Sequence, residues 1–115
     1  MKRYVLTCFL LLLSPVVFSD YSGGHDVSRL YISKDGQVSF GTSPQATNTC
    51  NYYNFHFKFD SSTAGGKSLL SLLLSAKLSK SKIDVWYSPS LNPGTNHTNG
   101  CSNANIANVS NIGIR

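Results

Sequence analysis

The chain has 115 residues, which is enough for one domain with one modest hydrophobic core. Its 10 Lys and Arg residues against 5 Asp and Glu residues give a formal net charge of +5 at pH 7. The positive charge is spread along the chain, with Lys77, Lys80 and Lys82 as the single cluster. We interpret this cluster as a solvated face and expect no nucleic-acid partner, because nucleic-acid surfaces concentrate positive charge.

The first 19 residues have the pattern of a secretory signal peptide. Lys2 and Arg3 precede an apolar run over 4–13, and Val17 and Ser19 lie three and one positions before the expected cut. The run is too short to span a membrane. We therefore expect a signal peptide over 1–19 and a single secreted or periplasmic domain over 20–115, with a net charge of +3 and no membrane-embedded part.

The cysteine content predicts one disulfide. Cys8 lies in the expected signal peptide, so the exported chain keeps Cys50 and Cys101, which an oxidising compartment would pair. A metal site is the alternative, but the chain has no Cys-x-x-Cys, and His56 and His97 have unrelated spacings. We expect a structural disulfide, no metal and no cofactor.

The first half of the domain alternates like β-strands. After a flexible start over 21–26, the runs 27–33 and 37–42 flank Lys34-Asp35-Gly36 and predict a hairpin. The core face of this hairpin holds Leu30, Ile32, Val38 and Phe40, and the opposite face of its first strand holds Arg29, Tyr31 and Ser33.

A third strand is predicted over 51–60, where aromatic and polar residues alternate strictly. Its core face would hold Tyr53, Phe55, Phe57 and Phe59, and its other face Tyr52, Asn54, His56 and Lys58. His56 is therefore expected at the surface of the sheet.

The period changes to that of a helix over 64–79, with Ser62 or Thr63 as the N-cap. Gly66-Lys67-Ser68 resembles the end of a phosphate-binding loop, but Ser61 stands where that motif needs its first glycine, so we interpret it as the helix start. The apolar stripe of this helix holds Leu69, Leu70, Leu72, Leu73, Ala76 and Leu78, part of which would cover the core or a partner subunit.

A fourth strand is predicted over 82–88, burying Ile83, Val85 and Tyr87 and presenting Asp84 and Trp86 to the other face. A loop over 89–99 and a weakly strand-like tail complete the chain. This order predicts a strand-rich α+β domain, either an OB-fold-like small barrel or a mixed sheet, with one helix between the third and fourth strands.

The pattern resembles a group of small exported bacterial proteins of uncharacterised function. The residues that carry this resemblance include Asp35-Gly36, Cys50, Gly66-Lys67, Asp84-Val85-Trp86-Tyr87, Pro93-Gly94-Thr95, Gly100-Cys101 and Ile112-Gly113-Ile114. In layout the domain also resembles the B subunits of AB5 toxins, including the subtilase-cytotoxin and pertussis-like types. That resemblance implies a glycan-binding homo-oligomer, for example a pentamer, and a catalytic toxin subunit as partner.

The titratable residues form no recognised catalytic constellation. His25, His56 and His97 lack a matched partner in sequence, there is no Glu, and neither Gly-x-Ser-x-Gly nor His-Glu-x-x-His occurs. A small secreted hydrolase therefore stays as a third alternative, and we expect a non-enzymatic protein.

Carbohydrate binding fits the aromatic and polar residues of the predicted outer faces. A sugar site needs an aromatic ring against a pyranose and a few fixed hydrogen-bond partners. We expect a secreted glycan-binding module, with an envelope protein-interaction protein as the alternative. The other interpretation of Trp86 and Tyr31 is that they pack in the core or at a subunit interface. The candidate binding residues are Trp86, Tyr31, Ser33, Tyr52, Lys58 and Asp84.

Overall fold

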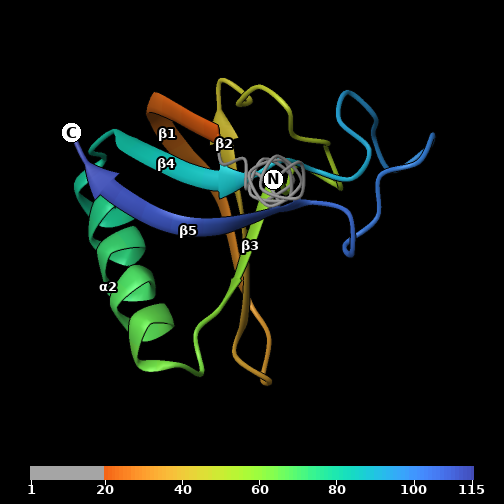
Figure 1. The fold of residues 1–115 in the computed structure, drawn as a ribbon. Helices are drawn as coiled ribbons and strands as arrows, with labels where there is room; N and C mark the ends of the chain where they lie inside the picture. The colour runs from red at the N-terminus through yellow and green to blue at the C-terminus, as the bar shows by residue number, and fades with distance from the viewer. Residues whose placement is uncertain (1–19) are drawn as a thin grey trace, which may run out of the picture.

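Residues 20–115 are described by a computed structural model, and the predicted signal peptide, 1–19, lies outside this range (Figure 1). The described part contains five strands and one helix. In chain order these are β1 (Asp20–Ile32), β2 (Gln37–Ser43), β3 (Phe57–Asp60), α2 (Ala64–Ser79), β4 (Ile83–Ser88) and β5 (Ala107–Ile114).

The five strands form a single mixed sheet in the order β1-β2-β3-β5-β4. The first strand is long enough, at 13 residues, to pair with β4 through its first half and with β2 through its second half. The β3–β5 pair is parallel and the other pairs are antiparallel. These features confirm a strand-rich α+β domain with its helix between the third and fourth strands.

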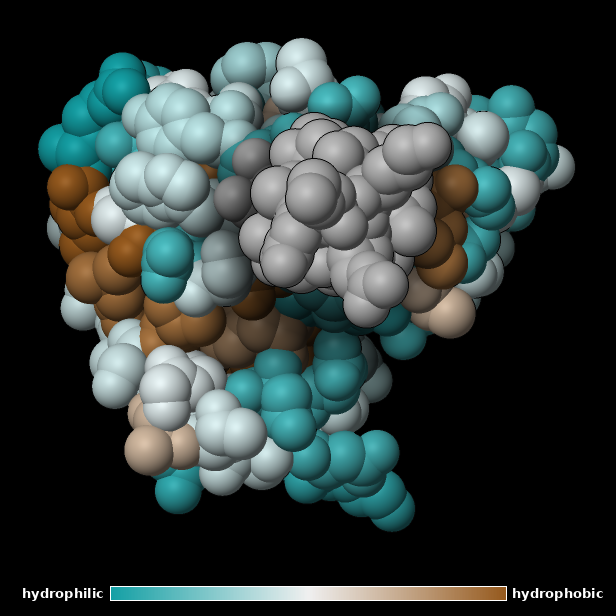
Figure 2. All heavy atoms as spheres, in the orientation of Figure 1, coloured by the Kyte–Doolittle hydropathy of each residue, from teal (hydrophilic) through white to brown (hydrophobic). Residues whose placement is uncertain are grey.

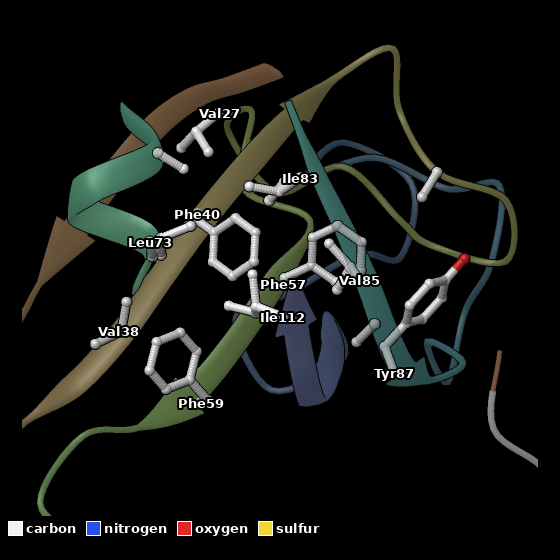
Figure 3. Close-up of a cluster of buried hydrophobic side chains, with 13 residues drawn as sticks. Val27, Val38, Phe40, Phe57, Phe59, Leu73, Ile83, Val85, Tyr87 and Ile112 are labelled. Atoms are coloured by element: carbon white, nitrogen blue, oxygen red, sulfur yellow. The ribbon is translucent and has the colours of Figure 1, made fainter. Parts of the chain in front are cut away.

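Side chains from all five strands and the helix meet in one core (Figure 3). The predicted inward residues of β4, which are Ile83, Val85 and Tyr87, are fully buried, as are Val38 and Phe40 of β2. The Tyr87 hydroxyl points away from the core and donates to the Thr47 carbonyl at 2.6 Å. The alternation of apolar residues therefore predicts this part of the core correctly.

The helix has the predicted bounds. The Thr63 hydroxyl caps it by accepting the Gly66 N–H at 2.9 Å, and Leu73 and Ala76 are buried against the sheet. Leu78, which the sequence analysis assigned to the buried stripe, is 83% exposed. Five residues advance a helix about 140° beyond a full turn, so Leu78 lies away from the face that carries Leu73.

The expected flexible start over 21–26 is wrong, because these residues belong to β1. Asp20 pairs with Tyr87 and Tyr21 pairs with Trp86 across the β1–β4 ladder. The register shifts between Ser22 and His25, where Gly24 has a φ of 76°. Pairing with a strand that comes about sixty residues later gives this glycine-containing segment its extended conformation.

The expected strand over 51–60 is also partly wrong, because β3 includes only Phe57–Asp60. Residues 52–55 form a turn, in which the Tyr52 and Phe55 main chains exchange hydrogen bonds of 3.0 and 2.8 Å. Tyr53 and Asn54, at its centre, have positive φ values of 50° and 69°. The turn reverses the chain, so the Tyr53 side chain is exposed and does not reach the core.

This 52–55 turn covers the outer face of β2 at a glycine. A Cβ atom added to Gly41 would overlap the carbonyl oxygen of Asn54. Main chain therefore approaches main chain here, and β2 is buried on both faces from Val38 to Thr42. A glycine in a strand interior often marks such an approach.

The predicted Cys50–Cys101 disulfide is present. The two cysteines and Ile106 form a second apolar cluster, against which Tyr52 and Phe55 pack. The Asn51 N–H also donates to the Thr95 carbonyl at 2.9 Å. The segment between β4 and β5 is thus attached to the 52–55 turn.

No helix within residues 20–115 is long and apolar enough to cross a membrane.

Substitution of Gly41 tests the main-chain contact under the turn. Gly41→Ala should lower the free energy of unfolding by about 1–3 kcal/mol, because the new methyl group meets backbone that cannot move independently. Gly65→Ala is the matched control, since nothing lies within 4 Å of a Cβ atom there and the helix gains up to about 1 kcal/mol. Urea unfolding measures both, and equal effects would contradict the contact.

Candidate functional site

The six predicted binding residues do not form one surface. Tyr31, Ser33 and Tyr52 line one groove, and Lys58 lines a depression beside it. Trp86 and Asp84 lie on β4, which pairs with the first half of β1. Trp86 is directly opposite Tyr21 in this pairing. Tyr21 precedes Tyr31 by ten residues on β1, which is about 30 Å along the strand.

The first of these surfaces, the β1–β2 groove, has a volume of about 500 Å³. It forms because residues that face each other across an antiparallel pair share one side of the sheet, as Tyr31 and Ser39 do. The hairpin loop and the segment between β4 and β5 add polar residues. The groove is lined by Arg29, Tyr31, Ser33, Asp35, Gln37, Ser39, Tyr52, Phe55 and Asn103.

Aromatic rings form one wall of the groove. Tyr31 is 56% exposed, and its ring centre lies 6.0 Å from that of Phe55. The Arg29 guanidinium lies 4.6 Å over the Phe55 ring, and its Nη1 donates to the Tyr53 carbonyl at 2.7 Å. Arg29 is therefore held against the turn by both its charge and its hydrogen bond.

Lys58 has a structural contact that the sequence did not indicate. Its Nζ donates to the carbonyls of Asn103 and Ala104 at 3.1 and 3.0 Å, so it holds the segment between β4 and β5 against β3. The depression around it measures about 550 Å³ and shares Asp35, Gln37 and Asn103 with the groove. The two hollows are therefore adjacent.

Trp86 and Asp84 take part in packing and charge pairing at the other end of β1. The Trp86 ring lies 4.9 Å from that of Tyr21, and Asp84 accepts the Gly24 N–H at 3.1 Å. Asp84 also pairs with the Arg115 guanidinium at 3.1 Å. The Asp84 carboxylate beside Trp86 therefore already holds the Gly24 main chain and the Arg115 side chain through its Oδ1.

The structure adds residues that the sequence analysis did not include in the site. Arg29 was predicted to face the same way as Tyr31, so strand alternation could have identified it. Phe55 was assigned to the core, and Asn103 lies in an irregular segment with no local signal. Both are brought to the groove by the 52–55 turn and the disulfide-linked segment.

His56 is buried, contrary to the expected surface position. It is 5% exposed, and its Nδ1 accepts the Thr42 N–H at 3.1 Å. The turn folds the chain over β2 just before β3 begins, and this buries the His56 side chain against the main chain of β2. Burial, and second the charge of His25, lower the pKa of His56 to about 4.

His25 connects β1 to the segment after β2. Its Nδ1 donates to the Pro44 carbonyl at 2.7 Å, and its Nε2 lies 2.6 Å from the Ser22 hydroxyl. A hydroxyl, an imidazole and an acceptor in this order resemble a nucleophile with its base. The imidazole is buried and lines neither hollow described above, so we interpret these bonds as structural.

No group of three or more His, Cys, Asp or Glu side chains between residues 20 and 115 is placed to hold a metal ion.

Comparison with known proteins gives no match to a protein-family profile, to a curated protein or to a solved structure. The ligand class that the site can bind is therefore inferred from its geometry and its side chains.

The buried His56 should make stability depend on pH. In the unfolded chain its pKa is the ordinary 6.5, so that state binds more protons than the folded state between pH 6.5 and about 4. Stability should fall by about 2 to 3 kcal/mol as the pH decreases through this window. Chemical unfolding at a series of pH values measures the slope.

His56→Asn should reduce this slope, because an amide oxygen can accept the Thr42 N–H without titrating. His97→Asn is the control, since His97 is exposed and stacks on Tyr53. An unchanged slope in His56→Asn would show that His56 titrates normally in the folded protein.

Proposed function

We propose that this protein is an exported, non-enzymatic carbohydrate-binding domain whose ligand occupies the β1–β2 groove. The observation that carries the proposal is the half-exposed Tyr31 ring in a groove with hydroxyl, amide and carboxylate groups around it. A flat aromatic ring can stack on the apolar face of a pyranose, and the polar groups can fix its hydroxyls.

The polar residues of the groove offer both donors and acceptors. Ser33 and Ser39 provide hydroxyls, Gln37 and Asn103 provide amides, and Asp35 provides a carboxylate. Such a mixture matches sugar hydroxyls, which donate and accept. The Ser33 hydroxyl already accepts the Gln37 N–H at 3.2 Å, so it is fixed in orientation.

The location of the groove supports the same function. The strand order and the position of α2 support a closed OB-type barrel, and we propose this architecture. OB barrels bind oligosaccharides and oligonucleotides on an outer face, between the β1–β2 loop and the β4–β5 loop. Here Asp35 comes from the first of these loops and Asn103 from the second.

Loss of the Tyr31 ring should weaken carbohydrate binding. On immobilised glycans, Tyr31→Ala should weaken binding by about tenfold or more, equivalent to about 1.4 kcal/mol, because the stacking surface is removed. Tyr21→Ala is the matched control, because Tyr21 is 48% exposed on the same strand but lies beside Trp86.

If Tyr21→Ala loses binding and Tyr31→Ala does not, the ligand lies at the Trp86 surface and the groove is not the site. If the wild-type protein binds no glycan, the envelope protein-interaction alternative replaces the carbohydrate proposal.

We also infer that the protein self-associates through α2. Figure 2 shows hydrophobic residues gathered on the side of the molecule where α2 lies. Leu74 and Leu78 of the helix and Ile114 at the end of β5 are exposed. A second copy of the chain that covers these apolar side chains would explain why they are exposed in the single chain. Several weak sugar sites in one assembly would then bind a glycan surface with avidity.

Light scattering tests this association. The wild-type protein should be an oligomer, and Leu78→Glu should shift it to a monomer, because a charge would be buried at the interface. Leu91→Glu, at another exposed leucine, is the control and should leave the mass unchanged. A monomeric wild-type protein would contradict the inference.

A further inference from the structure

The outward residues of four strands form one row across the sheet. Tyr31 of β1 lies opposite Ser39 of β2, and Ser39 lies opposite Lys58 of β3. Lys58 in turn lies opposite Asn108 of β5. Paired residues share one face of a sheet, and the neighbour of Lys58 on the other face, Phe57, is buried in the core. The row therefore lies on the outer face of the sheet.

This row connects the β1–β2 groove to the depression around Lys58, here named the Lys58 depression. Tyr31 and Ser39 line the groove, and Lys58 and Asn108 line the depression. The row crosses three inter-strand spacings, which is about 14 Å and longer than one pyranose ring. The two volumes, about 500 and 550 Å³, each fall in the range of a small-molecule site. The outer face therefore has room for linked sugars.

Three polar residues line both hollows and continue from one into the other. They are Asp35 of the hairpin loop, Gln37 at the start of β2, and Asn103 of the segment between β4 and β5. A ligand that extends from the groove into the depression therefore stays in contact with the same hydrogen-bonding groups.

The depression adds two hydrogen-bonding side chains of its own, Asp60 and Asn108, and both are exposed. The Asp60 Oδ1 accepts the Ser62 N–H at 2.8 Å, so Oδ2 remains as an acceptor. The hydrogen bonds from Ser62 lower the pKa of Asp60, so this carboxyl is ionised at neutral pH. The Asn108 amide can both donate and accept, as sugar hydroxyls require.

The charges around the depression favour an uncharged ligand. The Lys58 ammonium donates to the main-chain carbonyls of Asn103 and Ala104. Asp35 and Asp60 also line the depression, and neither forms an ion pair within residues 20–115. Two carboxylates thus face one ammonium group that is already bound, so a carboxylate on the ligand would be repelled.

We propose that the ligand is a chain of at least two linked, uncharged sugars, with one sugar on Tyr31 in the groove and the next in the Lys58 depression, bound to Asp60 and Asn108. This inference rests on the proposed carbohydrate function and deepens it by specifying the length and charge of the ligand. The groove supplies an aromatic surface for one ring, and the depression supplies hydrogen bonds for the next.

Isothermal titration calorimetry on the whole purified protein tests the length and the charge. The probes are glucose, cellobiose and cellotriose, then galactose, galactobiose and galactotriose, then mannose, mannobiose and mannotriose. In at least one series the trisaccharide should bind about tenfold or more tightly than the monosaccharide, because it reaches both hollows. Trigalacturonic acid, in which every sugar has a carboxylate, should bind more weakly than the tightest uncharged trisaccharide.

Variants assign the gain in affinity to the depression. Asn108→Ala should weaken trisaccharide binding by about fivefold, the loss expected for one neutral hydrogen bond, and leave monosaccharide binding unchanged. Asn111→Ala is the matched control, since Asn111 is also exposed on β5 but pairs with Trp86. Tyr31→Ala should weaken binding of every member of the series. Thermal unfolding checks that each variant is folded.

The proposal alone is overturned if a monosaccharide binds and its disaccharide and trisaccharide bind no more tightly. It is also overturned if Asn108→Ala binds the trisaccharide as the wild-type protein does, or if trigalacturonic acid is the tightest ligand. If no sugar in any series binds, the proposed carbohydrate function fails together with this inference, so the two failures are distinguishable.

Discussion

The contact between the 52–55 turn and β2 at Gly41 determines where the β1–β2 groove and the hollow on the other side of the turn lie. Because Gly41 has no side chain, the Asn54 carbonyl can rest directly on the strand. The turn then forms a ridge between the β1–β2 groove and a second hollow, whose lining includes Ser28 and Asn54. Arg29 spans the ridge through its contacts with Tyr53 and Phe55. Without this approach, neither hollow would have its present shape.

The disulfide stabilises the same ridge, because Tyr52 and Phe55 of the turn pack against the cluster of Cys50, Cys101 and Ile106. Cys50 and Cys101 are separated by 51 residues, so in the chain-entropy model their bond contributes about 4 kcal/mol of stability. It also fixes the segment that supplies Asn103 to the groove, and Lys58 holds the same segment at the carbonyls of Asn103 and Ala104, close to Cys101. The irregular segments on each side of the groove are thus joined to each other by a covalent bond and by the hydrogen bonds of Lys58.

Local sequence patterns predicted the elements whose conformation depends on local periodicity. The alternation around Val85 and the helical spacing over 64–79 both correspond to the structure, since each element has one continuous buried face. The same alternation failed at Tyr53 and His56. There, two residues with positive φ interrupt the strand, and the glycine that allows the turn to pack is in a different strand, outside the window in which the alternation is read.

The candidate site shows the same division. Tyr31 and Ser33 were identifiable from strand alternation, because the outer face of a hairpin follows directly from its period. The separation of Trp86 from Tyr31 was not, because it depends on β1 being long enough to pair with β4 and β2 in different halves.

Amide chemical-shift mapping with a bound oligosaccharide tests most directly whether the β1–β2 groove is the binding surface. If it is, the shifts should concentrate at Tyr31, Ser33, Gln37, Phe55 and Asn103. Shifts concentrated at Tyr21, Asp84 and Trp86, or no shifts with any oligosaccharide, would contradict the assignment.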